Sequence, residues 1–147
     1  MLYAAYGSNL LAAQMAARCP GALRAGSLLL PGFRLVMNRF ASAVPDASAR
    51  LPVGLWRVTE AHLAALDRFE GPHAYERRSV PLPEGGEAWI YLEIAHRPPP
   101  PAPDYVARCR AGTLEFGLPT AALEAALAAI GWSGEGGAAG GAGRGRG

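Results

Sequence analysis

The sequence contains no lysine, and all fourteen of its basic residues are arginine. This excludes enzymes that form a Schiff base through lysine, and it excludes the P-loop, whose lysine contacts nucleotide phosphates. The formal net charge is only +2, and half of it lies in the C-terminal tail. Because a nucleic-acid-binding protein needs a clustered basic face, we expect no nucleic-acid partner.

Cysteine is also scarce, since Cys19 and Cys109 are the only two. They form no Cys-x-x-Cys pair and have no histidine nearby, so we expect no metal site. We expect two reduced thiols in the core, with a disulfide between them as the alternative. The N-terminus lacks the features of a signal peptide, and no apolar run approaches the length of a membrane span. These absences predict a soluble, cytoplasmic protein with no membrane partner.

The apolar pattern predicts one folded domain over residues 1–132. A disordered tail rich in Gly, Ala and Arg is predicted over 133–147, because this segment has nothing to bury. The sequence leaves the oligomeric state open between a monomer and a homodimer. Strands are predicted at 2–6, 23–30, 33–40, 51–58, 75–82 and 87–94. Helices are predicted at 10–17, 60–69, 104–116 and 120–130.

Proline and glycine shape the predicted connections. Pro31-Gly32, between two apolar segments, indicates the turn of a β-hairpin. Residues 41–50 are small and polar and are predicted to be a loop, and the proline run at 98–101 is typical of an extended linker. Because strands do not alternate regularly with helices, the pattern favours a mixed α+β fold over a doubly wound sheet. We expect a small, partly closed β-barrel of about six strands with flanking helices.

The N-terminal segment is a predicted strand, turn and helix. Gly7 breaks the apolar strand at 2–6, because glycine accepts a positive φ. Ser8 and Asn9 are residue types that cap helices, and good helix formers follow at 10–17. Such a turn leaves backbone N–H groups at a positive helix end, where a carboxylate or phosphate can bind. An ordinary turn that binds nothing is the alternative.

Glu70 differs from the other carboxylates by its position at the predicted end of a helix. It directly follows Leu66-Asp67-Arg68-Phe69 and precedes Gly71-Pro72. A carboxyl group beside Leu66 and Phe69 would be partly desolvated, which raises its pKa and suits a general acid or base. A simple exposed glutamate at a helix end is the alternative.

Two short segments, taken together, carry a resemblance to a known family. They are residues 6–10 (YGSNL) and residues 66–71 (LDRFEG), the latter followed by 75–77 (YER). In order and spacing they resemble the two signature motifs of the gamma-glutamylcyclotransferase-like superfamily. A weaker similarity lies in Tyr105 with 109–112 (CRAG) and 117–119 (GLP). The resemblance covers about residues 1–132 and implies a small mixed α/β barrel.

The resemblance implies an enzyme without cofactors that cyclises a γ-glutamyl group to 5-oxoproline and releases the attached amine or amino acid. The glutamate of the second motif, which corresponds to Glu70, is the acid/base of that family. N–H groups of the N-terminal turn would bind the substrate α-carboxylate and the developing oxyanion. Three tyrosines are candidate pocket walls, each with a core role as an equal alternative. The implied substrate-binding residues are Tyr6, Gly7, Ser8, Asn9, Leu10, Tyr75 and Tyr105.

The released group stays open at this point. Members of the superfamily release a glutathione-derived dipeptide, another amino acid, the ε-amine of a lysine side chain or a biosynthetic intermediate. Residues 41–50 and 98–101 are candidates for shaping the leaving-group pocket. Two other functions compete: a binding module of the same fold without turnover, and an RNA-associated protein that uses Arg144 and Arg146.

Overall fold

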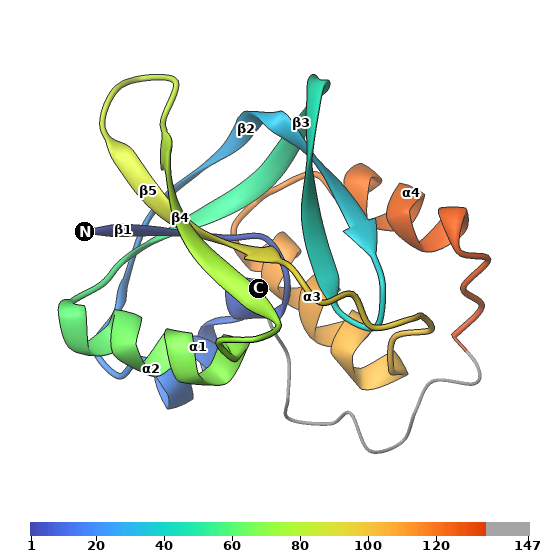
Figure 1. The fold of residues 1–147 in the computed structure, drawn as a ribbon, viewed down its shortest axis with the longest axis horizontal. Coiled ribbons are helices and arrows are strands. Elements are labelled where there is room, and N and C mark those ends of the chain that lie inside the picture. The colour runs from blue at the N-terminus through green and yellow to red at the C-terminus, as the bar shows by residue number, and fades with distance from the viewer. Residues whose placement is uncertain (135–147) are drawn as a thin grey trace.

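The structure is a computed structural model that describes residues 1–134, and Figure 1 shows how its elements are arranged. The strands are β1 (Leu2–Ala5), β2 (Leu23–Met37), β3 (Ala41–Arg57), β4 (Tyr75–Pro81) and β5 (Glu87–Glu93). The helices are the short 3-10 helix η1 (Ser8–Leu10) and the α-helices α1 (Ala12–Arg18), α2 (Glu60–Glu70), α3 (Pro103–Glu115) and α4 (Ala121–Ala129).

All five strands form one sheet in the order β2-β3-β1-β5-β4. β1 lies in its centre, antiparallel to β3 and parallel to β5, and the other pairs are antiparallel. The mixed α+β fold is therefore confirmed, and the sheet is not fully closed into a barrel. It has five strands among the described residues, where the sequence predicted about six.

Side chains alternate between the two faces of this sheet, as a period of two requires. On one face, here called the α3/α4 face, Ala4 and Ile90 pack with residues of α3 and α4. On the other, the α1/α2 face, Tyr3 and Tyr91 pack with residues of α1 and α2. In Figure 1, α1 and α2 lie together on one side of the sheet and α3 and α4 on the other.

The predicted hairpin turn at Pro31-Gly32 is wrong. β2 runs through both residues as one strand, and its pairing with β3 shifts in register between Pro31 and Phe33. β2 is an edge strand, where a proline that cannot donate is tolerated. Gly32 takes a φ of 94°, which suits a bulge within the strand. The true turn comes later, at residues 38–40, where the Asn38 N–H donates to the Phe40 carbonyl at 3.1 Å.

Residues 41–50 are also not the predicted loop, since they form the first part of β3. Phe33 is paired with Pro45, and Met37 with Ala41. Small and polar residues have little intrinsic strand preference. Here the hydrogen bonds to β2, rather than the local sequence, determine the strand.

The N-terminal helix starts later than predicted and has a different cap. Residues 8–10 form η1, and α1 begins at Ala12 with Leu11 at its N-cap and no side-chain cap. Ser8 and Asn9 therefore do not cap α1. Gly7 has a φ of −117°, so the predicted positive φ at this residue is wrong.

Three further predictions concern the cysteines, membrane-spanning segments and the C-terminal tail. Both cysteines are free and buried, which confirms the expected core thiols. No helix within residues 1–134 is long and apolar enough to span a membrane. The tail predicted to be disordered lies, from residue 135 on, outside the described residues.

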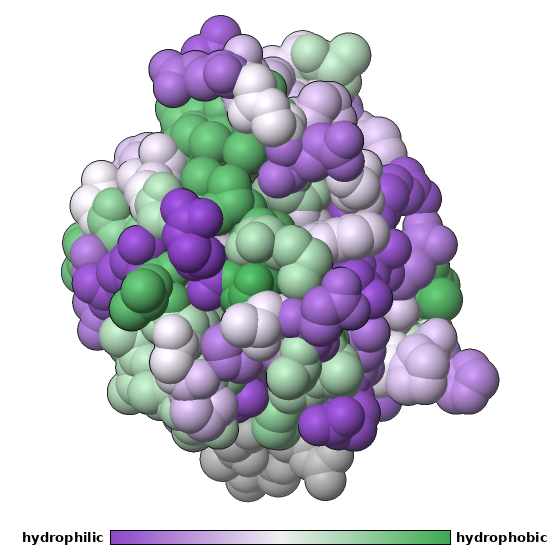
Figure 2. Space-filling model, turned by 90° about the vertical axis from the view of Figure 1, so that its left-hand side faces the viewer, coloured by the Kyte–Doolittle hydropathy of each residue, from purple (hydrophilic) through white to green (hydrophobic). Residues whose placement is uncertain are grey.

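The side of the molecule that Figure 2 presents carries an apolar patch. Apolar side chains gather in the upper half of this view and are bordered by hydrophilic groups. A groove of about 720 Å³ is lined by residues of β2, β3 and the β4–β5 turn, among them Leu28, Leu29, Leu55 and Leu82. It involves neither η1 nor the α-helices.

Candidate functional site

The two segments that carry the family resemblance meet in the structure. The Asn9 side-chain amide donates from Nδ2 to Oε1 of Glu70 at 3.5 Å, and the bond is buried. Asn9 belongs to η1 and Glu70 to the last turn of α2. The fold thus brings a carboxylate and the N-terminal turn to one place on the α1/α2 face.

Glu70 reaches this place because of how α2 begins and ends. Thr59 and His62 form a capping box at its start, and Gly71, with a φ of 85°, ends it. Leu63, Leu66 and Glu70 are buried along one stripe, at spacings that share a helix face. Glu70 is only 1% exposed, so the alternative of an exposed glutamate is wrong.

The two apolar neighbours expected for Glu70 differ in burial. Leu66 is fully buried, whereas Phe69 is 46% exposed. The guanidinium carbon of Arg18 lies 4.7 Å from the centroid of the Phe69 ring. Glu70 rather than Phe69 continues the buried stripe of α2, because a rotation of 100° per residue separates the two.

Asn9 holds the site together through both ends of its amide. Its Nδ2 also donates to the Tyr3 hydroxyl at 3.0 Å. Its Oδ1 accepts from Gln14 at 2.8 Å and from Arg18 at 2.9 Å, and its backbone carbonyl accepts from Trp56 Nε1 at 2.9 Å. This network fixes the orientation of the Asn9 amide, because Gln14 and Arg18 are donors and require the amide oxygen on their side.

Sequence reasoning missed four members of this network. Tyr3, Gln14, Arg18 and Trp56 lie on β1, α1 and β3, and none belongs to a motif. The only signal was Arg18, the one charged residue of α1. A buried arginine requires a partner, and the sequence does not show which one.

Charges in the site act on one another. Burial lowers the pKa of Arg18, and the negative charge of Glu70 opposes this effect. Burial and the charge of Glu70 together raise the pKa of the Tyr3 hydroxyl well above its ordinary value. Tyr3 is therefore neutral at physiological pH and able to donate or accept a hydrogen bond. The site combines one acid, one cation and several fixed neutral donors.

Not all of the backbone N–H groups predicted to bind substrate at the N-terminal turn remain available for it. The Leu10 N–H donates to the Gly7 carbonyl at 3.2 Å, and the Leu11 N–H to Ser8 at 3.0 Å. Leu10 is therefore not a spare donor. The N–H groups of Ser8 and Asn9 precede the first hydrogen bond of η1 and have no partner within the helix, and both residues are fully buried.

The three predicted pocket tyrosines are all buried, and each hydroxyl is hydrogen-bonded to backbone. Tyr6 donates to the Tyr91 carbonyl at 2.6 Å. Tyr75 donates to the Ala41 carbonyl at 3.0 Å, and the Ala41 N–H donates to Tyr105 at 2.9 Å. These bonds fix the rings, and burial raises the pKa of Tyr6 and Tyr105. Their role in substrate binding stays a prediction.

A groove of about 500 Å³ is lined by residues of α2, β4 and β5, among them Tyr75. In it, Tyr91 donates to Asp67 at 2.6 Å, and Asp67 forms an ion pair with Arg77 at 3.0 Å. The Arg77 guanidinium carbon stands 4.4 Å from the centroid of the Trp89 ring. Within the described residues, no group of three or more His, Cys, Asp or Glu could hold a metal ion.

Comparisons with known proteins agree on one family. The model of the family "Gamma-glutamyl cyclotransferase, AIG2-like" matches residues 3–107. A solved structure named "Gamma-glutamyl cyclotransferase" has 26% identity and a TM-score of 0.71, over 90% of this chain and 88% of the other. The human protein loc79017, described as uncharacterized, has 28% identity and a TM-score of 0.75, over 93% and 91%.

A more distant structure shares the fold alone. Protein ytfP from Escherichia coli has 23% identity and a TM-score of 0.51, over 65% of this chain and 84% of the other. A search of the curated proteins found no match.

Proposed function

The chain belongs to the gamma-glutamyl cyclotransferase, AIG2-like family, and on this premise we propose that it cyclises a γ-glutamyl group to 5-oxoproline. The attached amine or amino acid is released. The observation that carries the proposal is the buried contact between Asn9 and Glu70, which joins the turn and the acid. A structural neighbour that is named for this activity supports it.

Glu70 is the acid/base in this proposal. It takes a proton from the α-ammonium group of the substrate, and the free amine then attacks the γ-carbonyl carbon. As the new ring C–N bond forms, the amide C–N bond to the leaving group breaks. The protons lost by the attacking nitrogen pass to the leaving nitrogen through Glu70, so the reaction consumes no water.

The turn supports the same step by electrostatics and position. The Ser8 and Asn9 N–H groups suit the substrate α-carboxylate or the oxygen that gains charge. Asn9 and Arg18 orient the carboxylate of Glu70 through their shared network. Holding the amine next to its own carbonyl favours ring closure, because both groups are already in one molecule.

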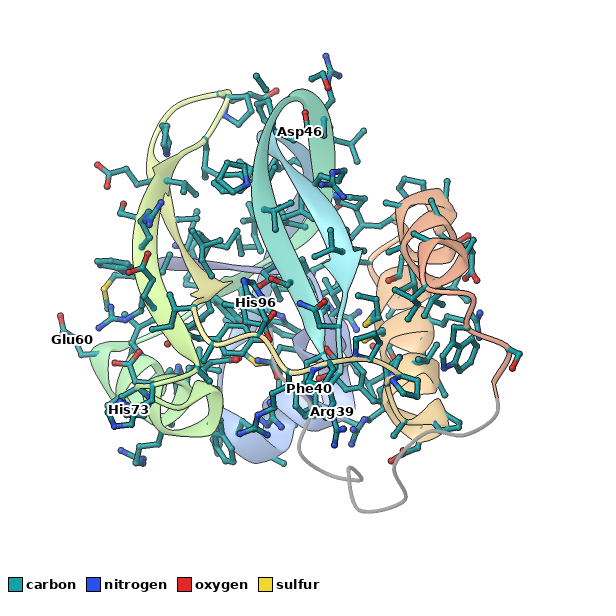
Figure 3. All side chains as sticks on the ribbon, turned by 45° about the vertical axis from the view of Figure 1, so that its right-hand side comes forward. Arg39, Phe40, Asp46, Glu60, His73 and His96 are labelled. Carbon is teal, nitrogen blue, oxygen red and sulfur yellow. The ribbon has the colours of Figure 1, made fainter. Side chains whose placement is uncertain are left out.

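The decisive experiment measures 5-oxoproline release from a panel of γ-glutamyl amino acids and γ-glutamyl amines. We expect turnover, and we expect Glu70→Gln to lower kcat by about 10²–10⁴-fold, the usual contribution of general acid–base catalysis. Glu60→Gln is the matched control, because Glu60 lies at the other end of α2 and points away from the molecule (Figure 3).

Two outcomes would contradict the proposal. If no member of the panel yields 5-oxoproline, the activity is absent. A γ-glutamyl compound that binds in calorimetry and is recovered intact would then support the non-catalytic binding module. If Glu70→Gln retains full turnover while its unfolding is unchanged, another group is the base.

A further inference from the structure

Two arginines, Arg39 and Arg108, have side-chain donors that are buried. Nε of Arg39, and Nε and Nη2 of Arg108, are shielded from solvent and make no hydrogen bond within residues 1–134. Neither guanidinium forms an ion pair with any described carboxylate. A buried donor without a partner is costly, so such a pair indicates a place for an external anion.

Arg108 lies on the side of α3 that faces η1. It shares this side with Tyr105 and Gly112, at spacings of three and four residues. The Arg108 guanidinium carbon is 5.9 Å from the centroid of the Tyr105 ring. At Gly112 the two elements touch directly, because an added Cβ would come within 2.5 Å of the Leu11 nitrogen. Arg108 is one helical turn from Gly112 on α3. It therefore lies near η1, which carries Asn9 of the candidate site.

Arg39 approaches Tyr105 from the turn between β2 and β3. Its neighbour Phe40 packs edge-on against Tyr105, with ring centroids 5.2 Å apart. The Arg39 N–H donates to the Arg97 carbonyl at 3.1 Å. Figure 3 shows Arg39 and Phe40 side by side at this turn. Arg108 and the turn that carries Arg39 thus both adjoin the Tyr105 ring.

The turn that carries Arg39 is anchored by another carboxylate, Glu93. Its Oε1 accepts from Asn38 Nδ2 at 2.7 Å and lies 2.9 Å from His96 Nδ1. Glu93 is therefore occupied by Asn38 and His96. Glu70, in turn, acts on Arg18. Both carboxylates thus interact with residues other than Arg39 and Arg108.

We propose that Arg39 and Arg108 form an anion subsite for the carboxylate of the released amino acid. This rests on the proposed function and names its substrate class, which is a γ-glutamyl amino acid rather than a γ-glutamyl amine. The α-carboxylate of the γ-glutamyl group shares a carbon with the attacking amine, so it stays near Glu70, Arg18 and η1. A second carboxylate, on the leaving group, suits the second pair of cations.

The test compares three substrates. γ-Glutamyl-alanine carries both carboxylates. γ-Glutamyl-alaninamide lacks the one on the leaving group, and 4-aminobutyryl-alanine, which would close to 2-pyrrolidinone, lacks the one on the γ-glutamyl side. For the wild type we expect the amide to have a kcat/KM about tenfold to a hundredfold below that of γ-glutamyl-alanine, as for a lost charged hydrogen bond.

Variants assign this difference to the two arginines. Arg108→Gln and Arg39→Gln should lower kcat/KM for both substrates that end in alanine, and should leave the amide unchanged. Arg108→Lys keeps the charge and should restore part of the loss. Arg110→Gln is the matched control on the same helix, because Arg110 already pairs with Glu124 at 2.6 Å. Thermal unfolding of each variant shows whether it is folded.

Each contrary result has a distinct meaning. If the wild type releases 5-oxoproline equally well from the acid and the amide, the subsite proposal is wrong while the proposed function stands. If Arg108→Gln lowers turnover of the amide but not of 4-aminobutyryl-alanine, these arginines bind the γ-glutamyl carboxylate instead. If none of the three substrates is cyclised but another γ-glutamyl compound of the panel is, the subsite proposal alone is wrong. If no compound of the panel is cyclised either, the proposed function fails and the subsite with it.

Discussion

The two faces of the sheet are both buried, but they differ in the polar groups packed against them. On the α3/α4 face, Leu51, Val53 and Ile90 are fully buried among other apolar side chains. Next to the α1/α2 face, the fold encloses four polar side chains at 6% exposure or less: Ser8, Asn9, Arg18 and Glu70.

This difference matters because apolar and polar side chains affect stability differently when they are buried. A buried polar group costs free energy unless it is hydrogen-bonded, and a buried charge costs more. On the α1/α2 face, this cost is offset because the Asn9 side chain forms hydrogen bonds with Tyr3, Gln14 and Arg18. On the α3/α4 face, the buried tyrosines Tyr6 and Tyr105 bond to backbone groups instead.

The largest expected effect on stability comes from the α3/α4 face. Leu51→Ala should lower the free energy of unfolding by about 2–5 kcal/mol, because it removes a fully buried side chain and leaves a cavity. Urea unfolding measures this loss. Below the unfolding transition we expect an unchanged kcat/KM, and a large fall in activity there would contradict the separation of the two faces.

On the α1/α2 face, Asn9→Ala should affect both stability and activity. Removing the amide leaves donors of Gln14 and Arg18 without an acceptor, which should cost about 1–3 kcal/mol. Glu70 also loses the contact that orients it, so kcat should fall about tenfold to a hundredfold. The experiment pairs urea unfolding with 5-oxoproline release, and Leu51→Ala is the control. Full activity in a folded Asn9→Ala protein would contradict the proposed role of the network.

The two cysteines allow a milder comparison, because each lies on one face. Burial raises the pKa of Cys19 on the α1/α2 face to about 11 and that of Cys109 on the α3/α4 face to about 12. Both thiols are protonated at pH 8, so iodoacetamide should label them far more slowly in the native than in the unfolded protein.

Raising the pH should speed the labelling of both cysteines, since only the thiolate reacts. At a given pH, Cys19 should have about ten times the thiolate fraction of Cys109. Mass spectrometry of the alkylated peptides measures the two rates. Native labelling as fast as in urea would show that the face in question is open to solvent.

The smallest effect is expected outside both faces, at the ion pair of Arg110 and Glu124. The hydrogen bond from Arg110 lowers the pKa of Glu124. Its stabilisation is therefore present above the pKa of the unfolded state and is lost as the pH falls through the lower, folded pKa. Both side chains are more than a third exposed, so Glu124→Gln should cost only about 0.2–1 kcal/mol at pH 7.

Urea unfolding at pH 7 and in acid tests this predicted pH dependence of the ion pair. The difference between wild type and Glu124→Gln should vanish in acid, once Glu124 is protonated. A difference that persists at low pH would indicate packing between α3 and α4 rather than charge.

Local sequence patterns correctly predicted those strands and helices in which apolar residues recur with the period of the element. In the predicted strand 87–94, a period of two puts Ala88, Ile90 and Leu92 on one face and Trp89 and Tyr91 on the other, and the structure has the same division. For α2, the apolar stripe and Gly71 located the helix to within one residue of its observed end. Such signals lie within a few residues and need no knowledge of the partner.

Predictions failed where a distant partner decides the conformation. Pro31-Gly32 is a turn signal in isolation, yet the pairing of β2 with β3 makes it a bulge. Gly7 was assigned a positive φ that the fold does not use. The motifs pointed to Glu70 and the turn, which the structure brings into contact. The sequence missed Tyr3, Gln14, Arg18 and Trp56, because their spacing carries no signal.

The sequence by itself determined that Leu63 and Leu66 share a helix face, because 3.6 residues complete one turn. It also determined the family, through two short motifs. Only the tertiary structure decided that Asn9 and Glu70, 61 residues apart, form a buried hydrogen bond. That contact requires β1 to pair with β3 and β5 and α2 to pack on the resulting face. Pairing and burial of this kind depend on the whole chain, so no local pattern contains them.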